Sequence, residues 1–179
     1  ADVGSHAYDL LRWMLGDEAE RVLTHADVIT PAKPDLGELD LAEAIAWGSE
    51  HRAEEALSLR KGTAYDYASI AIQTKKGAVG TIALSHAPFI RKGMAPDLEL
   101  HGTDASISID RTSGQLKLFR SDSGPETMTS PTAGEVNRFR EYVFPALHER
   151  IAGTDSDHPG LDDGFHVQIF TDAAARSAK

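Results

Sequence analysis

The chain has 179 residues, of which 41% are hydrophobic and 26% are charged, and both values are ordinary for a soluble globular protein. The formal net charge of -10 argues against nucleic acid or an anionic membrane as a partner, because both require basic surfaces. The absence of cysteine excludes disulfides and cysteine-ligated zinc. No apolar run approaches the roughly 20 residues of a membrane span. The composition therefore favours one cytoplasmic domain over residues 1–179.

The first residues predict an amphipathic helix that ends at about Gly16. Asp2 or Ser5 suits the N-cap, a glycine follows the last turn, and apolar residues recur between them at helical spacing. These apolar residues are Val3, Ala7, Leu10, Leu11 and Met14. The sequence starts without methionine, inside a motif of chemically functional side chains. We therefore expect a further part of the protein upstream.

Strands dominate the middle of the chain. Residues 20–30 predict a strand, and the polar residues 31–62, interrupted by proline and glycine, predict a loop with a short helix. From residue 64 the hydrophobic period changes to two, so residues 66–72 and 78–86 predict a hairpin with its turn at 75–77.

The same pattern continues in three short segments, residues 97–101, 106–110 and 115–119, which predict an antiparallel meander. A link over about 121–134 precedes a helix over 136–151, in which Pro145 predicts a kink, and the final helix is expected to begin near Asp162. The predicted fold class is α+β, with a mostly antiparallel open sheet and helices on one of its faces.

Asp2 and His6 are the candidate catalytic residues. Residues four apart on a helix share a face, so the two side chains can act on one substrate. Imidazole titrates near neutral pH and suits the removal of a hydroxyl proton. The helix dipole lowers the pKa of such a histidine, and a neighbouring carboxylate raises it. From spacing alone, the alternative that Asp2 is only an N-cap and His6 a solvated residue is favoured.

A second group of candidate residues lies near the C-terminus, where carboxylates and imidazoles are closely spaced. Such groups bind divalent metals that activate water. A metal-dependent hydrolase that uses Asp155, Asp157 and His158 is therefore an alternative, although no spacing matches a known metal motif. Asp162 or Asp163 also suits the N-cap of the last helix. The other member of the group is His166.

The sequence contains no Gly-x-Gly-x-x-Gly after a strand and no phosphate-binding loop of the Walker type. Taken alone, the chain therefore has no recognisable residues for nucleotide binding, and we expect no cofactor-binding residue and no metal ligand in it.

Five short stretches nevertheless resemble one family of nucleotide-dependent enzymes. The order Asp2, Gly4, His6, Asp9 and Trp13, followed by a glycine, resembles the Asp-x-Gly-x-His-x-x-Asp...Trp-x-x-Gly stretch of the glucose-fructose oxidoreductase / inositol dehydrogenase / MocA family. The likeness continues in the family's order through residues 66–69, 77–82, 98–107 and 163–168. One departure is Ala105, where the family commonly has glycine in a hairpin turn.

The resemblance implies an NAD(P)-dependent oxidoreductase that acts on a sugar, cyclitol or related polyol. An upstream dinucleotide-binding domain would bind NAD or NADP and supply a catalytic lysine, while Asp2 and His6 complete the site. Asp9, His86 and Arg91 are the candidate substrate contacts.

The resemblance also implies that the chain is inactive alone and that the open sheet face forms a homo-oligomer, either a dimer or a tetramer. His86 and His101 are expected on that open side. The non-catalytic alternative is a binding or oligomerisation module that uses the same sheet face.

Overall fold

The computed structural model describes residues 2–50, 58–86, 98–110, 113–129, 136–137, 139–154 and 159–178. The chain folds into two compact units, one of Ala1–Ile90 with Leu161–Lys179 and one of Arg91–Gly160. Among the described helices, none combines the length and the apolar character that crossing a bilayer requires.

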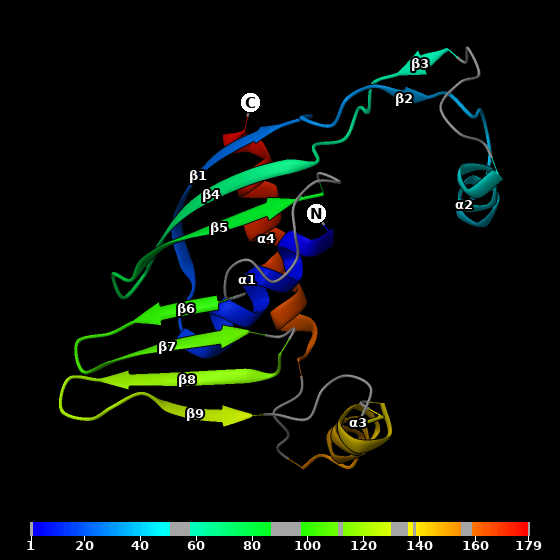
Figure 1. The fold of residues 1–179 in the computed structure, drawn as a ribbon. Coiled ribbons are helices and arrows are strands. Elements are labelled where there is room, and N and C mark those ends of the chain that lie inside the picture. The colour runs from blue at the N-terminus through cyan, green and yellow to red at the C-terminus, as the bar shows by residue number, and fades with distance from the viewer. Residues whose placement is uncertain are drawn as a thin grey trace. The chain divides into compact units, whose positions relative to one another are not determined.

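The first unit is built on a three-stranded antiparallel sheet in the order β1-β4-β5 (Figure 1). Its strands are β1 (Ala19–Asp27), β4 (Tyr67–Thr74) and β5 (Val79–Ser85). The hairpin between β4 and β5 turns at Gly77, whose φ of 93° is accessible to glycine at little cost. The predicted strand and the predicted hairpin are both confirmed.

Two helices, α1 (Asp2–Leu15) and α4 (Leu161–Ser177), cover one face of this sheet (Figure 1). The Tyr8 ring stacks on Phe170 with ring centroids 3.8 Å apart, and the Tyr8 hydroxyl accepts a 3.0 Å hydrogen bond from the Ala19 backbone N–H. The other buried apolar residues of this core are Ile70, Ile72, Ile82 and Ala174. The core therefore lies where the apolar stripes of the two helices meet the alternating residues of the strands.

The segment between β1 and β4 forms the short pair β2 (Lys33–Pro34) and β3 (Leu59–Arg60) and the helix α2 (Leu41–Glu50). The start of α2 is a reciprocal capping box. The Glu43 N–H donates to the Asp40 carboxylate at 2.8 Å, and the Asp40 N–H donates to the Glu43 carboxylate at 2.9 Å. The predicted short helix is confirmed, whereas the β2–β3 pair was not predicted because two-residue strands show no alternation.

The second unit contains an antiparallel meander in the order β6-β7-β8-β9. It consists of β6 (Leu98–His101), β7 (Ala105–Asp110), β8 (Gln115–Arg120) and β9 (Glu126–Thr129). Strand β9 lies in the segment that was expected to be a link, because its polar, exposed residues give no apolar alternation. A π-helical turn, η1 (Phe139–Val143), runs directly into α3 (Phe144–Ile151), so the change from π to α geometry lies beside Pro145 in the first turn of α3.

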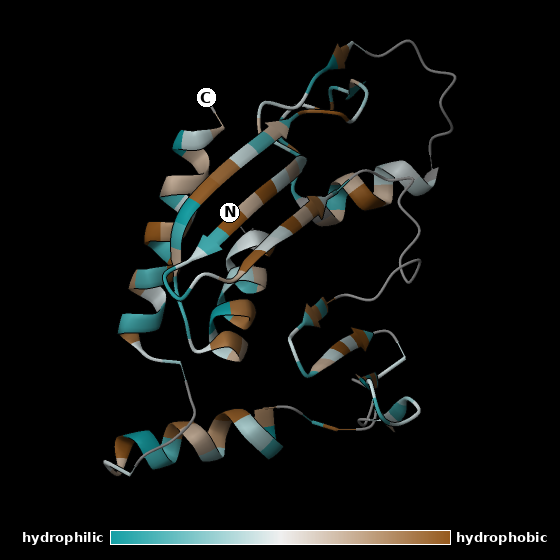
Figure 2. Ribbon diagram, turned by 90° about the vertical axis from the view of Figure 1, so that its left-hand side faces the viewer, coloured by the Kyte–Doolittle hydropathy of each residue, from teal (hydrophilic) through white to brown (hydrophobic). Residues whose placement is uncertain are grey.

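Both units agree with the predicted class, an α+β fold with antiparallel sheets. Apolar and polar residues alternate along the strands, as expected for sheets with one packed face and one open face (Figure 2).

Candidate active site

Helix α1 has two faces with different surroundings. Its inner face packs on the sheet and on α4 through Ala7, Tyr8 and Leu11. At Gly4, an added Cβ would lie 3.0 Å from Leu84 Cδ1, so glycine allows the first turn of α1 to approach β5 closely. These contacts fix the orientation of the helix and thereby the direction of its outer face.

The outer face of α1 is exposed and unusually apolar. Val3, Leu10 and Trp13 are 43%, 40% and 62% exposed, and His6 is exposed on the same side of the helix. Position 2 lies four residues before His6, so the helical period places both positions on this face. The side chain of Asp2 lies outside the described side chains. His6 thus stands on a rigid helix with its imidazole accessible to another molecule.

Asp9, a candidate substrate contact, takes part in a charge network around Arg12. The Arg12 guanidinium lies 2.7 Å from the Asp163 carboxylate and 3.7 Å from the Asp9 carboxylate. Burial acts to lower the pKa of Arg12, but the hydrogen bond and charge of Asp163, with the charges of Glu18 and Asp9, outweigh it and raise that pKa. The structure therefore gives Asp9 a partner on its own helix.

Glu18 extends this network to the β4–β5 turn and to α4. Lys75 Nζ lies 2.8 Å from Glu18 Oε2, and His166 Nδ1 lies 3.0 Å from Glu18 Oε1. The hydrogen bond from Lys75 is the main cause that lowers the pKa of Glu18, and the neighbouring charges of His166, Lys75 and Arg12 act in the same direction. The network therefore holds the C-terminal end of α1 against the first turns of α4.

The metal hypothesis had grouped Asp163 and His166 with other residues near the C-terminus. Instead, Asp163 pairs with Arg12 and His166 contacts Glu18. Within the described part of the chain, no group of three or more histidine or carboxylate side chains is placed to hold a metal ion. Asp155, Asp157 and His158 lie outside the described residues.

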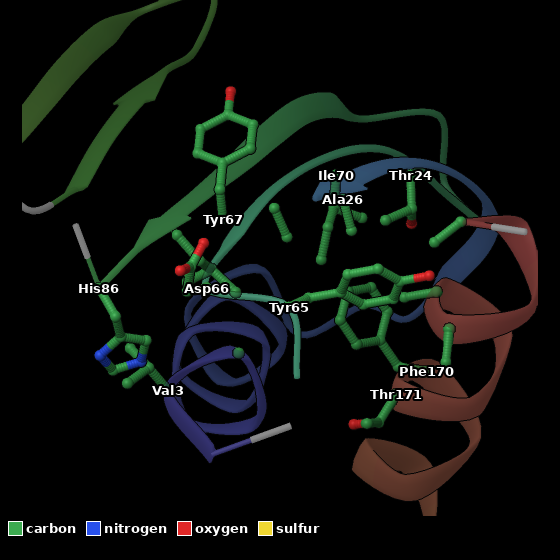
Figure 3. A pocket seen from close by; sticks show the side chains of 16 residues that line it. Val3, Thr24, Ala26, Tyr65, Asp66, Tyr67, Ile70, His86, Phe170 and Thr171 are labelled. Atoms are coloured by element: carbon green, nitrogen blue, oxygen red, sulfur yellow. The ribbon is translucent and has the colours of Figure 1, made fainter. Parts of the chain in front are cut away.

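His86 lies one residue beyond the end of β5, where it lines a cavity together with Val3 and Gly4 of α1 (Figure 3). The expectation that His86 faces the open side of the sheet is wrong. It follows Leu84 by two residues and therefore shares the side of the sheet that the helices cover, because side chains alternate along a strand. The structure thus brings His86 beside the first turn of α1.

The predictions for His101 and Arg91 have different outcomes. His101 lies on the exposed side of β6, opposite Leu98 and Leu100, and its Nδ1 lies 3.0 Å from Ser106 Oγ. Its predicted position opposite the apolar residues is therefore confirmed. Arg91 lies outside the described residues.

Sequence reasoning did not single out Asp66, which joins the strand ends beside this cavity. Its carboxylate accepts backbone hydrogen bonds from Ile29 at 2.8 Å and Thr30 at 3.0 Å. A hydrogen bond from the Thr30 side chain, followed by the backbone bonds, lowers the pKa of Asp66. Its backbone carbonyl also accepts from the His86 N–H at 2.8 Å. In the sequence it appears only as the first residue of the predicted strand 66–72 and of the motif 66–69.

Residues 1–179 match the family model described as "Oxidoreductase family, C-terminal alpha/beta domain". No curated protein sequence is significantly similar to the chain.

Several solved structures share the fold. An oxidoreductase domain protein from Kribbella flavida is 19% identical with a TM-score of 0.74, and the match covers 99% of this chain and 48% of that chain. Levoglucosan dehydrogenase in complex with NADH and levoglucosan is 21% identical with a TM-score of 0.72, over 99% of this chain and 47% of that chain. The transcriptional regulator Gal80p from Kluyveromyces lactis is 14% identical with a TM-score of 0.72, over 97% of this chain and 42% of that chain.

The chain therefore spans about half the length of these solved relatives or less. At these identities the likeness shows the fold, and the family model carries the assignment. Because that model matches the whole chain, the protein belongs to the glucose-fructose oxidoreductase / inositol dehydrogenase / MocA oxidoreductase family, of which it forms the C-terminal alpha/beta domain.

Proposed function

We propose that this chain is the substrate-side domain of an NAD(P)-dependent oxidoreductase that acts on a sugar, cyclitol or related polyol. The observation that carries the proposal is the exposed His6 on the outer face of α1, in a chain that matches an oxidoreductase domain over its full length. Structures of levoglucosan dehydrogenase with NADH and either levoglucosan or L-sorbose support a sugar as the class of substrate.

In this proposal His6 is the acid and base of the reaction. Its imidazole takes the proton from the substrate hydroxyl during oxidation and returns it to the carbonyl oxygen during reduction. Asp2, one helical turn earlier, orients His6 and accepts a hydrogen bond from the substrate. An exposed imidazole on a helix held by packing suits this role, because the helix limits where the nitrogen can lie.

Three further residues are proposed as substrate contacts. His86 has the clearest structural support, since it lies beside the first turn of α1. Asp9 would contact substrate only in competition with Arg12, with which it is paired. Arg91 is proposed from its place in the sequence after His86.

The described residues of this chain do not fit a nicotinamide dinucleotide. The paired strands in them are antiparallel, and no glycine-rich turn connects a strand to a helix N-terminus there. We therefore assign the cofactor to an upstream dinucleotide-binding domain, where nicotinamide would supply the hydride acceptor. The present chain contributes proton transfer and substrate orientation, and alone it would be inactive.

The test compares the full-length protein with residues 1–179. Each is incubated with NAD or NADP and a panel of sugars, cyclitols and polyols, and reduced nicotinamide is followed by absorbance. We expect turnover of at least one panel member by the full-length protein only. Failure of the full-length protein with every member, or tight NADH binding by residues 1–179 in a fluorescence titration, would contradict the proposal.

We also propose that the open face of the three-stranded sheet forms a homo-oligomer, a dimer or a tetramer. Leu23 and Val79 on this face are 70% and 81% exposed. The strand register places Ala71, Gln73 and Thr81 between them, and the exposed Arg21 lies on the same face in the row of Gln73 and Val79. An exposed sheet face that carries large apolar side chains is a typical association surface.

Light scattering tests this surface. Leu23→Asp is expected to shift the oligomer to monomer, since it replaces an exposed apolar side chain of the interface with a charge. Leu59→Asp on β3, at an equally exposed leucine away from this sheet, is the matched control and should leave the mass unchanged. A wild-type protein that is strictly monomeric contradicts the surface without affecting the proposed chemistry.

A second candidate function is a non-catalytic binding module of the same fold. The structural likeness to Gal80p favours it, because that protein is named a transcriptional regulator and not an oxidoreductase. The two candidates differ in one outcome: a binding module would bind its small molecule without any turnover in the cofactor assay.

A further inference from the structure

A cavity lies between the first turn of α1, the C-terminal half of α4 and the sheet face that these helices cover (Figure 3). Its volume is about 360 Å³, within the range of roughly 300–1,000 Å³ that small-molecule sites occupy. Three alanines, Ala174, Ala175 and Ala178, line it at the C-terminal end of α4 and just beyond that end, and their short side chains leave this space open.

The lining is mainly apolar and aromatic. Ile70 and Leu84 come from the strands, and Phe170 comes from α4. In Figure 3 the Tyr65 ring extends across the cavity towards Phe170, whereas the Tyr67 ring points away from it. A ligand that fills this space would therefore present a flat or compact apolar group to these side chains.

One buried polar atom among the described lining residues has no hydrogen-bond partner. Thr24 Oγ1 is buried, and no hydrogen bond to it exists within the described part of the chain. The backbone N–H of Thr24 is satisfied, because it donates to Ser177 Oγ at 3.0 Å. The other threonine of the lining is also satisfied, since Thr171 Oγ1 donates to the Val167 carbonyl at 2.8 Å. A buried hydroxyl without a partner is unfavourable, so a ligand group that pairs with it gains affinity.

The charges around the cavity limit the class of ligand. Among the described residues of the lining there is no lysine or arginine, and the one carboxylate among them, Asp66, already accepts two backbone hydrogen bonds. His86 and Tyr65 are exposed residues that can contact a polar end. The chemistry suits neither an anion nor a strongly charged cation.

We propose that this cavity binds a neutral small molecule with an apolar ring and one hydroxyl or carbonyl group, and that this group pairs with Thr24 Oγ1. The cavity shares Val3 and His86 with the proposed substrate side of α1, whereas His6 itself is not among its lining residues. The inference does not depend on the proposed oxidoreductase activity.

The test uses residues 1–179 and two probes, para-fluorobenzyl alcohol and para-fluorotoluene, with binding measured by fluorine NMR. Both probes are expected to bind in competition with each other. Thr24→Val keeps the shape of the side chain and removes the hydroxyl. It should weaken binding of the alcohol about fivefold, which corresponds to the loss of one hydrogen bond. Binding of para-fluorotoluene should be unchanged.

A second set of variants tests whether a larger side chain in the cavity blocks binding. Ala175→Leu, at an exposed lining position, should weaken both probes by about tenfold, because a larger side chain occupies the space. Ala173→Leu, the same substitution at a half-buried position of this helix outside the lining, is the control and should change neither affinity. Circular dichroism verifies that all variants are folded. The proposal is overturned if neither probe binds, if Ala175→Leu leaves both affinities unchanged, or if Thr24→Val does not weaken the alcohol.

Discussion

The two ends of α1 are built differently. At the C-terminal end, Arg12 pairs with Asp163, and Glu18 pairs with Lys75 and His166, so charged side chains tie the helix to α4 and to the β4–β5 turn. At the N-terminal end, the first turn lies beside a cavity and His6 is exposed. One end of the helix is therefore held by charged contacts, and the other end is accessible to another molecule.

A group that acts on substrate must be accessible and yet held in position. Here the charge network and the stacked Tyr8 and Phe170 rings hold the helix from its middle and its C-terminal end. The first turn can then present its outer residues without packing them. We infer that the contacts that stabilise the fold lie away from the residues proposed to act on substrate. Substitutions at the C-terminal end of α1 should therefore lower stability, and substitutions at its N-terminal end should lower activity.

The largest expected effect on stability is at the core between the two ends. Tyr8→Ala removes the ring stack on Phe170 and the hydrogen bond at Ala19, and should lower the free energy of unfolding by about 3 kcal/mol. Tyr65→Ala, at a tyrosine that is 55% exposed, should lower it by less than about 1 kcal/mol. Urea unfolding measures both, and equal losses would contradict the comparison.

The next effect is at the charge network. Arg12→Met leaves the Asp163 carboxylate without its 2.7 Å partner and should lower the free energy of unfolding by about 2 kcal/mol, between the values for exposed and buried pairs. Arg60→Met is the control, because Arg60 is 70% exposed and lies 3.8 Å from Asp35. The same urea series should show little change for it. A loss at Arg60 as large as that at Arg12 would mean that the network has no special role.

The helices and strands of the fold could largely be predicted from the sequence, because they follow the local periodicity of hydrophobic residues. The helical spacing of Val3 to Met14 predicted α1, and the alternation after residue 64 predicted the β4–β5 hairpin. The family resemblance, confirmed over the whole chain, rested on motifs of a few residues each. Strand β9 was not predicted, because its exposed residues show no apolar alternation.

The candidate site was only partly predictable, because its partners come from distant segments. Arg12 and Asp163 are 151 residues apart, and nothing in the sequence pairs them. The side of the sheet on which His86 lies was predicted wrongly, although counting two residues from Leu84 would have placed it correctly. The cavity is lined by Ala174, Ala175 and Ala178 together with Thr24 of β1, and no local pattern in the sequence brings these two segments together.

The smallest effect concerns pH. The folded state lowers the pKa of Glu18, which faces Lys75, His166 and Arg12, below its unfolded value of about 4.3. A lowered carboxyl pKa stabilises the fold above the unfolded pKa, and this contribution is lost as pH falls through the folded pKa. The melting temperature of the wild type should therefore exceed that of Glu18→Gln at pH 7, and the difference should shrink below about pH 4. Glu38→Gln, an exposed control outside the network, should give no such pH-dependent difference.

The central claim is that the N-terminal end of α1 acts chemically while the rest of the molecule holds it. The most direct measurement is kcat/KM of the full-length protein with His6→Ala, with His148→Ala at an exposed histidine of α3 as the control. We predict a loss of about 10²–10⁴-fold for His6→Ala, as expected for an acid–base group, with an unchanged melting temperature and full activity in His148→Ala. Wild-type turnover in His6→Ala would contradict the account.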